Sequence, residues 1–208
     1  MEGYKVITIG REFGSGGHEI GNRLATRLDI PLYDNNLIRM VAEKLDIREE
    51  TAQAVDETTL NSFLRGYVMS SIEQSSELTG AEYVPPLTEQ VYELQSQIIR
   101  KLAARGPCVI VGRCADYVLR DHPELVSVFI HANMEFRMGR VEAEYHLPEN
   151  KLKDFIIKTD KKRASYSNFQ SEKKWGAASS YNLCLESSAL GIDKCVDLIL
   201  DYIRYRQN

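Results

Sequence analysis

The sequence lacks long apolar runs: no stretch approaches the ~18–20 consecutive apolar residues that a membrane span needs. The first residues lead almost at once into a strand-like segment, without the apolar core of a signal peptide. We therefore expect a cytoplasmic protein that does not associate with membranes.

An excess of positive charge is also absent. The formal net charge is −4 and the isoelectric point is about 5.7. Such a chain has no global basic field to attract nucleic acid or anionic lipid. Any polyanion site must be a local cluster of arginine and lysine, so the expected partner is a small molecule rather than a nucleic acid.

Paired cysteines are the third absence. The chain has four cysteines, none of them in C-x-x-C spacing: Cys108, Cys114, Cys184 and Cys195. Three lie in or beside apolar runs, as buried free thiols do. We expect reduced thiols and no zinc site. At 208 residues, without repeats or low-complexity linkers, the chain can form one core with a lid or an inserted helical subdomain.

Glycine, by contrast, is concentrated between a strand-like segment and a helix-like one. Residues 5–9 (KVITI) are apolar and β-branched, which suits a buried strand. Four glycines follow within eight residues: Gly10, Gly14, Gly16 and Gly17. In such a loop, backbone amides and the positive end of the next helix can bind an anion. The predicted cradle for nucleotide phosphates consists of Gly14, Ser15, Gly16, Gly17 and His18.

This loop departs from the Walker A pattern G-x-x-x-x-G-K-[ST] at two positions. Gly17 stands in place of the lysine, and His18 in place of the hydroxyl residue that binds magnesium. His18 can hydrogen-bond a phosphate or cap the helix, but it cannot act as a hard oxygen ligand for magnesium. Arg11 or a distant cation can replace the lysine. The alternative is a glycine-rich turn that binds nothing.

Strand-like segments alternate with helical ones along most of the chain. After residues 5–9, strand patterns recur at residues 30–34, 108–111, 125–130 and 181–185. This alternation predicts an α/β fold with a parallel sheet. Ligands of such folds bind beyond the carboxyl ends of the strands. Besides the glycine loop, the polar residues expected there are Asp34, Arg39, Arg113 and Asp116.

The arginines differ in how strongly they indicate a site. Arg113 follows a buried strand and a glycine, where a guanidinium can grip a phosphate; the alternative is a bridge from strand end to helix. Arg39 fits a surface position equally well. Arg137 and Arg140 share a helix with many charges, and we expect them on its solvated face.

Two segments interrupt the predicted core. Residues 46–105 show helical spacing without a clear strand and predict a helical insertion. Residues 148–178 are dense in charge and predict a lid that brings cations to transferring phosphates, with solvated surface as the alternative. The core of this single domain then comprises residues 1–45, 106–147 and 179–208. Trp175 is a candidate anchor for the lid.

Four segments resemble, in order, the cytidylate kinase-like branch of the nucleoside monophosphate kinases. They are GREFGSGGHEIG, IPLYDNNLI, VIVGRCADYVL and the DKKR of the charged segment. The resemblance implies a three-layer P-loop NTPase-type fold, with a five-stranded parallel sheet, a helical insertion that binds the nucleoside monophosphate, and a lid. It also implies transfer of the γ-phosphate of ATP, with Mg²⁺, to CMP or dCMP.

The resemblance further implies roles for individual residues. Residues 14–16 match the Gly-Ser-Gly of the phosphate loop, and Asp34 matches the aspartate that ends the second strand. Arg113 matches an arginine that contacts the acceptor monophosphate. Asp160 and Arg163 match a lid pair that helps to bind CMP.

Other positions depart from the family pattern. The aspartate that follows Gly-Arg in the family falls at Cys114, with Asp116 two residues later. No arginine occurs between Arg65 and Arg100, where the family has one in its insertion. Arg39 matches only loosely, because the family's arginine lies two residues further on.

Three functions are compatible with these residues. The first is a nucleotide kinase-like phosphotransferase, in which Arg39 and Arg113 hold the acceptor phosphate, Arg163 closes from the lid, and Arg11 or a lid lysine replaces the loop lysine. The second is a non-catalytic nucleotide- or phosphate-binding regulatory protein, because both Walker A side chains are absent. The third is a kinase for another small acceptor, such as a sugar or a modified nucleoside.

Overall fold

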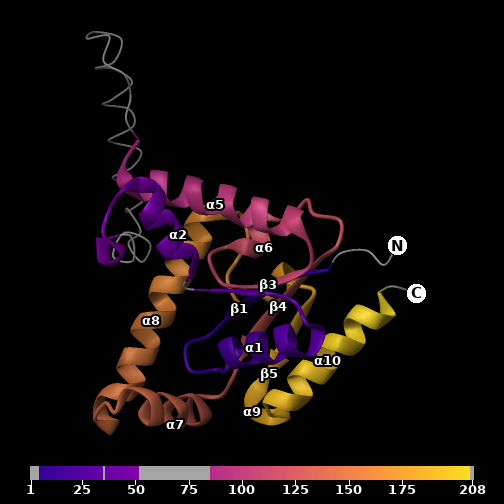
Figure 1. The fold of residues 1–208 in the computed structure, drawn as a ribbon. Coiled ribbons are helices and arrows are strands. Elements are labelled where there is room, and N and C mark those ends of the chain that lie inside the picture. Colours follow the sequence, from indigo (N-terminus) through magenta and orange to yellow (C-terminus); the bar gives the residue numbers. More distant parts are fainter. Residues whose placement is uncertain (1–4, 35, 52–84, 207–208) are drawn as a thin grey trace, which may run out of the picture.

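Five parallel strands form one sheet in the order β2-β3-β1-β4-β5 (Figure 1). The computed structural model describes residues 5–34, 36–51 and 85–206. The strands are β1 (Val6–Arg11), β2 (Leu32–Tyr33), β3 (Cys108–Val111), β4 (Leu125–His131) and β5 (Leu183–Glu186). The predicted α/β fold with a five-stranded parallel sheet is thus confirmed. Within the predicted helical insertion, residues 52–84 lie outside the described residues.

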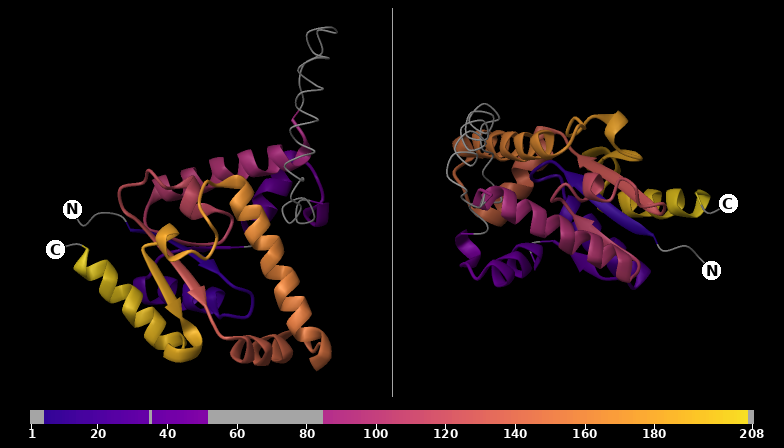
Figure 2. Two further views of the ribbon diagram at one scale, coloured as in Figure 1. Left: turned by 180° about the vertical axis from the view of Figure 1, so that it is seen from behind. Right: turned by 90° about the horizontal axis from the view of Figure 1, so that it is seen from above.

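Helices cover both faces of the sheet (Figures 1 and 2). On one face, α1 (Gly17–Leu28) and α10 (Ile192–Tyr205) pack against Ile7 and Ile9 of β1. On the other, α2 (Asn36–Leu45), α5 (Leu87–Arg105) and α6 (Ala115–Val118) pack around Val6. Successive strand residues point to opposite faces, so the continuous apolar strands supply both cores.

The end of the predicted insertion packs in the core, whereas the predicted lid contains a long helix. α5, at the end of the predicted insertion, buries Val91, Ile98, Ile99 and Leu102 and so forms part of the core layer. The segment that was predicted as the lid contains one long helix, α8 (Glu149–Gln170), of 22 residues. It follows α7 (Met134–Tyr145), whose first turn is capped by the side chain of Asn133.

α8 runs past the edge at which β1 ends, and the chain then returns to the sheet (Figure 2). The return segment includes a short 3₁₀ helix (Ala178–Ser180) before β5, and α9 (Ser187–Leu190) follows β5. Trp175 packs edge-on against Phe129 of β4, with ring centroids 5.1 Å apart, which anchors this segment. Across the described ranges, no helix combines the length and apolarity needed to cross a bilayer.

Candidate functional site

The glycine-rich loop joins β1 to α1 at the carboxyl edge of the sheet. Gly14 and Gly16 have φ angles of 78° and 80°, a left-handed conformation that residues with side chains rarely adopt. Ser15, between them, is buried, and its hydroxyl donates to the carbonyl oxygen of Glu12 at 2.8 Å. The Ser15 hydroxyl therefore holds the loop together and does not face a ligand.

Backbone amides at the start of α1 have no internal acceptor. The first amide of this helix that donates a hydrogen bond is that of Ile20, which donates to the Gly16 carbonyl at 2.9 Å. Within the described residues, the amides of Gly17 and His18 meet no hydrogen-bond acceptor. The positive end of the 12-residue α1 lies at the same point. Open amides at a helix N-terminus are the arrangement that a phosphate cradle requires.

Arg11, the last residue of β1, passes over two glycines. A β-carbon on Gly17 would lie 2.5 Å from Cβ of Arg11, and one on Gly112 would lie 2.0 Å from its Nη1. Neither approach is possible between non-bonded atoms, so a side chain at either position would displace Arg11. The glycine that replaces the Walker A lysine is therefore the residue that makes room for Arg11.

The turn after β3 presents Arg113 in an unusual backbone conformation. Gly112, Arg113 and Cys114 have φ angles of 79°, 58° and 52°, so three successive residues are left-handed. For residues other than glycine this conformation costs about 1–2 kcal/mol each. Such strain persists only where the surrounding structure enforces it, and it is concentrated at binding and catalytic sites.

Three guanidinium groups, from β1, the turn after β3 and α8, lie close enough to affect one another. Burial, followed by the charges of Arg163 and Arg113, lowers the pKa of Arg11 well below its usual value, while Asp34 opposes the shift. Burial also lowers the pKa of Arg113, and Arg163 adds to that shift. Crowded cations of this kind are stabilised by a bound anion.

The three arginines line one cavity of about 420 Å³. Its walls come from the loop after β1, the turn after β3, α7, α8 and the segment before β5. Its charged lining consists of four basic side chains and one carboxylate: Arg11, Arg113, Lys162, Arg163 and Asp116. Aromatic rings form much of the remainder: Phe13, Tyr145, Phe155, Tyr166, Trp175 and Tyr181.

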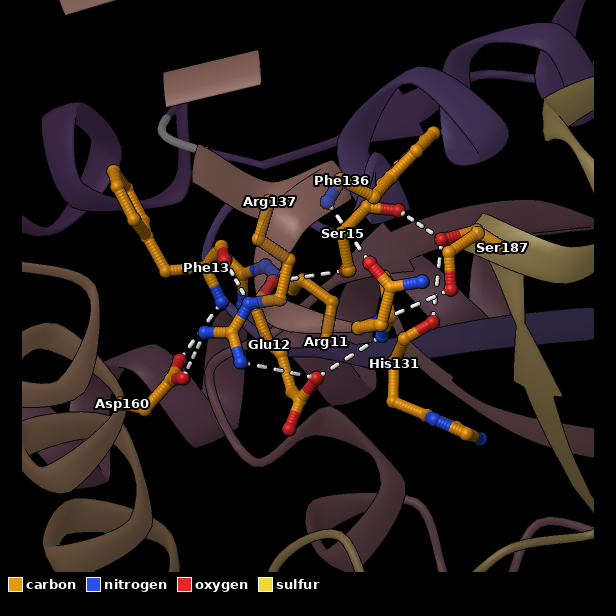
Figure 3. A network of polar contacts seen from close by, with 12 residues as sticks. Arg11, Glu12, Phe13, Ser15, His131, Phe136, Arg137, Asp160 and Ser187 are labelled. Carbon is orange, nitrogen blue, oxygen red and sulfur yellow. Dashed lines mark hydrogen bonds and ion pairs between the residues drawn. The ribbon is translucent and has the colours of Figure 1, made fainter. Parts of the chain in front are cut away.

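Arg137 of α7 is buried beneath the loop (Figure 3). Its Nε donates to the Phe13 carbonyl at 2.8 Å, its Nη1 lies 3.2 Å from the Glu12 carboxylate, and its Nη2 pairs with Asp160. Asp160 also accepts the backbone N–H of Phe13 at 2.8 Å. We call Arg137, Glu12 and Asp160 the clamp, because they hold the loop backbone at Phe13.

The expectation that Arg137 lies on a solvated helix face is wrong. Arg137 is 4% exposed, and it shares the buried face of α7 with Val141, one turn later. This i, i+4 relation to an apolar residue is the signal in the sequence that could have indicated burial. Arg140 is partly exposed and pairs with Glu19 of α1 at 2.8 Å.

Comparison with known proteins agrees with this architecture. The model of the cytidylate kinase-like family matches residues 6–189. The chain belongs to the cytidylate kinase-like family. The resemblance of the glycine loop, the second strand and the GRCADYVL segment is thereby confirmed. No curated protein matches the chain.

Solved structures place this family member among P-loop folds. An uncharacterized protein from Eubacterium ventriosum is 30% identical with a TM-score of 0.71, over 96% of this chain and 98% of that one. A shikimate kinase from Bacteroides thetaiotaomicron is 15% identical with a TM-score of 0.53, over 97% and 99%. A gluconokinase from Sinorhizobium meliloti is 14% identical with a TM-score of 0.53, over 98% and 93%. The two kinases show the fold alone, which is the P-loop NTPase α/β fold.

The family resemblance assigned Asp160 and Arg163 to one acceptor-binding pair, but the structure separates their surroundings. Asp160 uses both carboxylate oxygens in the clamp and does not line the cavity. Arg163, less than one turn away, does line it. Its guanidinium lies 5.2 Å from the centre of the Phe13 ring and donates to the Arg11 carbonyl at 3.3 Å.

The predicted donor-binding residues 14–18 do not line the cavity, and neither do two predicted acceptor-binding residues, Arg39 and Asp34. The side chain of Arg39 is 62% exposed, and Glu43, one turn along α2, lies 4.0 Å away. Asp34, at the end of β2, accepts a 2.6 Å hydrogen bond from the ring of His18. Asp34 nevertheless lies near enough to Arg11 and Arg113 to oppose the lowering of their pKa values. The structure thus brings together Arg11, Arg113, Arg163 and Asp116, whereas Arg39 lies apart from them.

The described residues do not fit a magnesium site held by side chains. They include no group of three or more His, Cys, Asp or Glu suited to a metal ion. The Ser15 hydroxyl is engaged with Glu12, and His18 is engaged with Asp34. Magnesium prefers oxygen ligands and often binds through substrate phosphates. Any such ion would therefore have to arrive with the nucleotide.

Asp116 and Cys114 are two titratable residues in the cavity lining, and burial shifts the pKa of both. Burial raises the pKa of the Asp116 carboxyl above its usual value, although Lys173, 3.8 Å away, opposes the shift. Burial, with a contribution from Asp116, raises the pKa of the Cys114 thiol to about 12. Cys114 therefore remains protonated at neutral pH and is no candidate nucleophile.

Proposed function

We propose that this protein transfers the γ-phosphate of ATP to CMP, dCMP or a related small acceptor. One observation carries the proposal: three arginines from distant parts of the chain line one cavity, and one of them, Arg11, packs against Gly17 at the helix N-terminus whose amides are open. Amides of this kind suit the phosphates of the donor. The crowded guanidiniums suit the charge of a transferring phosphoryl group and of an acceptor phosphate.

In this reaction an oxygen of the acceptor attacks the γ-phosphorus, and the bond from that phosphorus to the bridging oxygen of ADP breaks. Positioning and charge neutralisation dominate such a transfer. Residues 14–18 would hold the donor phosphates, and Arg113 the acceptor phosphate. Arg11 and Arg163 would neutralise the charge that develops on the transferring group.

Arg11 is the replacement for the missing loop lysine in this proposal. Its side chain occupies the space beside Gly17 from which a lysine would emerge, and its guanidinium reaches Gly112. It is fixed by close packing, and a cation in a fixed position stabilises a transition state without reorganising. Removal of one such donor or cation commonly costs about 10²–10³-fold in rate.

The test is a turnover assay with ATP, magnesium and a panel of acceptors. The panel contains CMP, dCMP, UMP and AMP, together with shikimate and gluconate as acceptors without a nucleotide. We expect ADP and a phosphorylated product with a nucleotide acceptor, and loss of turnover in Arg11→Met. If no acceptor is phosphorylated, phosphotransfer by this protein is ruled out for the panel.

A second function is favoured by a specific observation. Both Walker A side chains are missing, and His18 in the hydroxyl position is engaged with Asp34. A regulatory protein that binds nucleotides or phosphate without transfer would need the amides and arginines but not those two side chains. Thermal stabilisation by nucleotides without any product would favour this function over the first. Product that depends on magnesium would exclude it.

A further inference from the structure

Three aromatic rings that line the cavity have no part in the phosphate chemistry proposed above. Phe13 lies in the loop, Tyr145 ends α7 and Phe155 lies on α8. Each ring contacts the other two, with centroid distances of 5.5 Å, 5.4 Å and 5.9 Å. All three line the cavity, and we call them the aromatic rim.

The aromatic rim exposes apolar surface in the lining of a cationic cavity. Tyr145 is 45% exposed and Phe155 is 37% exposed. Among the described residues, only four large hydrophobic side chains are this exposed, and the other two, Leu198 and Tyr205, lie on α10. Two of the four therefore meet at the cavity, where a ligand would cover them.

The aromatic rim contacts one of the cavity arginines. The guanidinium of Arg163 lies over the Phe13 ring, with its central carbon 5.2 Å from the ring centre. A ligand that suits an aromatic surface next to a cationic one has a planar ring at one end and phosphate at the other. Every nucleobase has a π-face that stacks on aromatic side chains, and phosphate suits a guanidinium.

From this arrangement we infer that the aromatic rim binds the base of the nucleotide whose phosphate occupies the arginine cavity. The inference rests on the proposed function for its phosphate site and adds a subsite for the base. It specifies a ligand of the nucleoside phosphate class, as opposed to a phosphorylated sugar or sugar acid, which has no ring with a π-face. The base belongs either to the donor or to the acceptor, and matched ligands distinguish the two.

The experiment compares ligands that differ only in having a nucleoside or a base. ATP is paired with inorganic tripolyphosphate, and CMP is paired with ribose 5-phosphate. Binding is measured by calorimetry and by the fluorescence of Trp175, the single tryptophan of the chain, which lines the same cavity. The variants are Phe155→Ala and Tyr145→Ala. The control is Leu198→Ala, which removes a comparably exposed side chain, 42% exposed, on α10.

We expect both rim variants to bind one ring-bearing ligand about tenfold more weakly, since base stacking is worth about that factor or more. Binding of the matching ring-free ligand should be unchanged, and the Leu198→Ala control should bind all four as the wild type does. Weakening of ATP alone assigns the rim to the donor, and weakening of CMP alone assigns it to the acceptor. Phe155→Tyr should retain most of the affinity, because it retains the ring.

Equal weakening of ring-bearing and ring-free ligands would overturn the inference, since it would show a structural effect on the cavity. Unchanged affinity for ATP and CMP in both variants would overturn it as well. These results leave the proposed transfer intact if the wild type turns over. Conversely, ring-dependent binding without any product would refute the transfer and support the rim. A wild type that binds none of the four ligands would refute both.

Discussion

Arginine has opposite electrostatic surroundings in the clamp and in the neighbouring cavity. In the clamp, the three donor groups of Arg137 meet the Phe13 carbonyl and the carboxylates of Glu12 and Asp160. In the cavity, Arg11 has two guanidiniums as neighbours, and burial together with their charges lowers its pKa. The clamp therefore resembles a structural ion network, whereas the cavity stores positive charge that a bound anion would neutralise.

The number of arginines near a phosphate loop does not by itself identify the residues that bind its ligand. Arg137 lies on the buried face of α7, and protein groups accept its hydrogen bonds. Arg163, on the next helix, lies in the cavity and contacts Phe13. Removal of a cavity arginine should reduce catalysis or anion binding, whereas removal of the clamp arginine should reduce folding stability. The following predictions separate the two.

The largest expected effect is on catalysis in Arg11→Met. Methionine keeps the unbranched apolar stem that packs beside Gly17 but removes the charge. We expect kcat to fall about 10³-fold, the upper range for loss of one transition-state donor or cation. The melting temperature should stay the same or rise, because one of three crowded charges is removed. A large loss of melting temperature with unchanged kcat would place Arg11 in the structural class instead.

The next effect is on folding in Arg137→Met. Removing one partner of a buried ion network typically costs 3–5 kcal/mol, and the partly exposed Glu12 favours the low end, about 3 kcal/mol. For a chain of this length that corresponds to a melting temperature lower by about 6–12 °C. The control is Arg204→Met, whose side chain is 70% exposed on α10 and should change little. A melting temperature equal to that of the control would contradict the clamp.

A third effect is stabilisation by an anion, measured by thermal shift with inorganic tripolyphosphate. At ten times its dissociation constant, a ligand of the native state adds about 1.4 kcal/mol, or roughly 3–6 °C here. We expect this shift for the wild type and a much smaller one for Arg163→Met at the same concentration. The Arg204→Met control should keep the full shift. An identical shift in Arg163→Met would show that the anion binds elsewhere.

The smallest effect is a pH-dependent stability difference in Asp116→Asn. Because burial raises the pKa of Asp116 in the folded state, the folded protein binds more protons than the unfolded chain between the two pKa values. The wild type therefore loses stability as pH rises through the folded pKa, whereas asparagine does not titrate. The advantage of the variant in melting temperature should be near zero at about pH 3.5, below the pKa of an unfolded aspartate, and should be greater at pH 7.

The control for that measurement is a variant of Lys173, the cation beside Asp116. Lys173 lies 3.8 Å from Asp116 and loses its partner in Asp116→Asn, which works against the gain. Lys173→Met should have the opposite effect and destabilise the protein at pH 7, because it leaves the carboxylate without its cation. If Asp116→Asn is less stable than the wild type at pH 7 and equal to it at low pH, attraction by Lys173 outweighs burial.

The sequence determined the α/β class, the parallel sheet and the position of the phosphate loop. Apolar β-branched runs such as Cys108–Val111 suit only buried strands, and a glycine-rich turn before an amphipathic helix has few other structures. The helix start at Asn133 was also predictable, because a side-chain cap is a local interaction. The expected strand ends placed Asp34, Arg39, Arg113 and Asp116 at one edge with the glycine loop; of these four, only Arg113 and Asp116 line the cavity.

Tertiary structure alone decided what each charged side chain does there. The residues next to Arg137 and Asp160 in the sequence do not indicate that the two side chains meet at Phe13. Their partners lie 23 to 147 residues away and are selected by packing. The path of Arg11 over Gly17 and Gly112 likewise depends on the approach of β1, α1 and β3. Helix caps, turns and the apolar patterns of strands and helices involve neighbouring residues, which the sequence shows directly. The charge of a site depends on distances between remote segments, and these exist only in the folded chain.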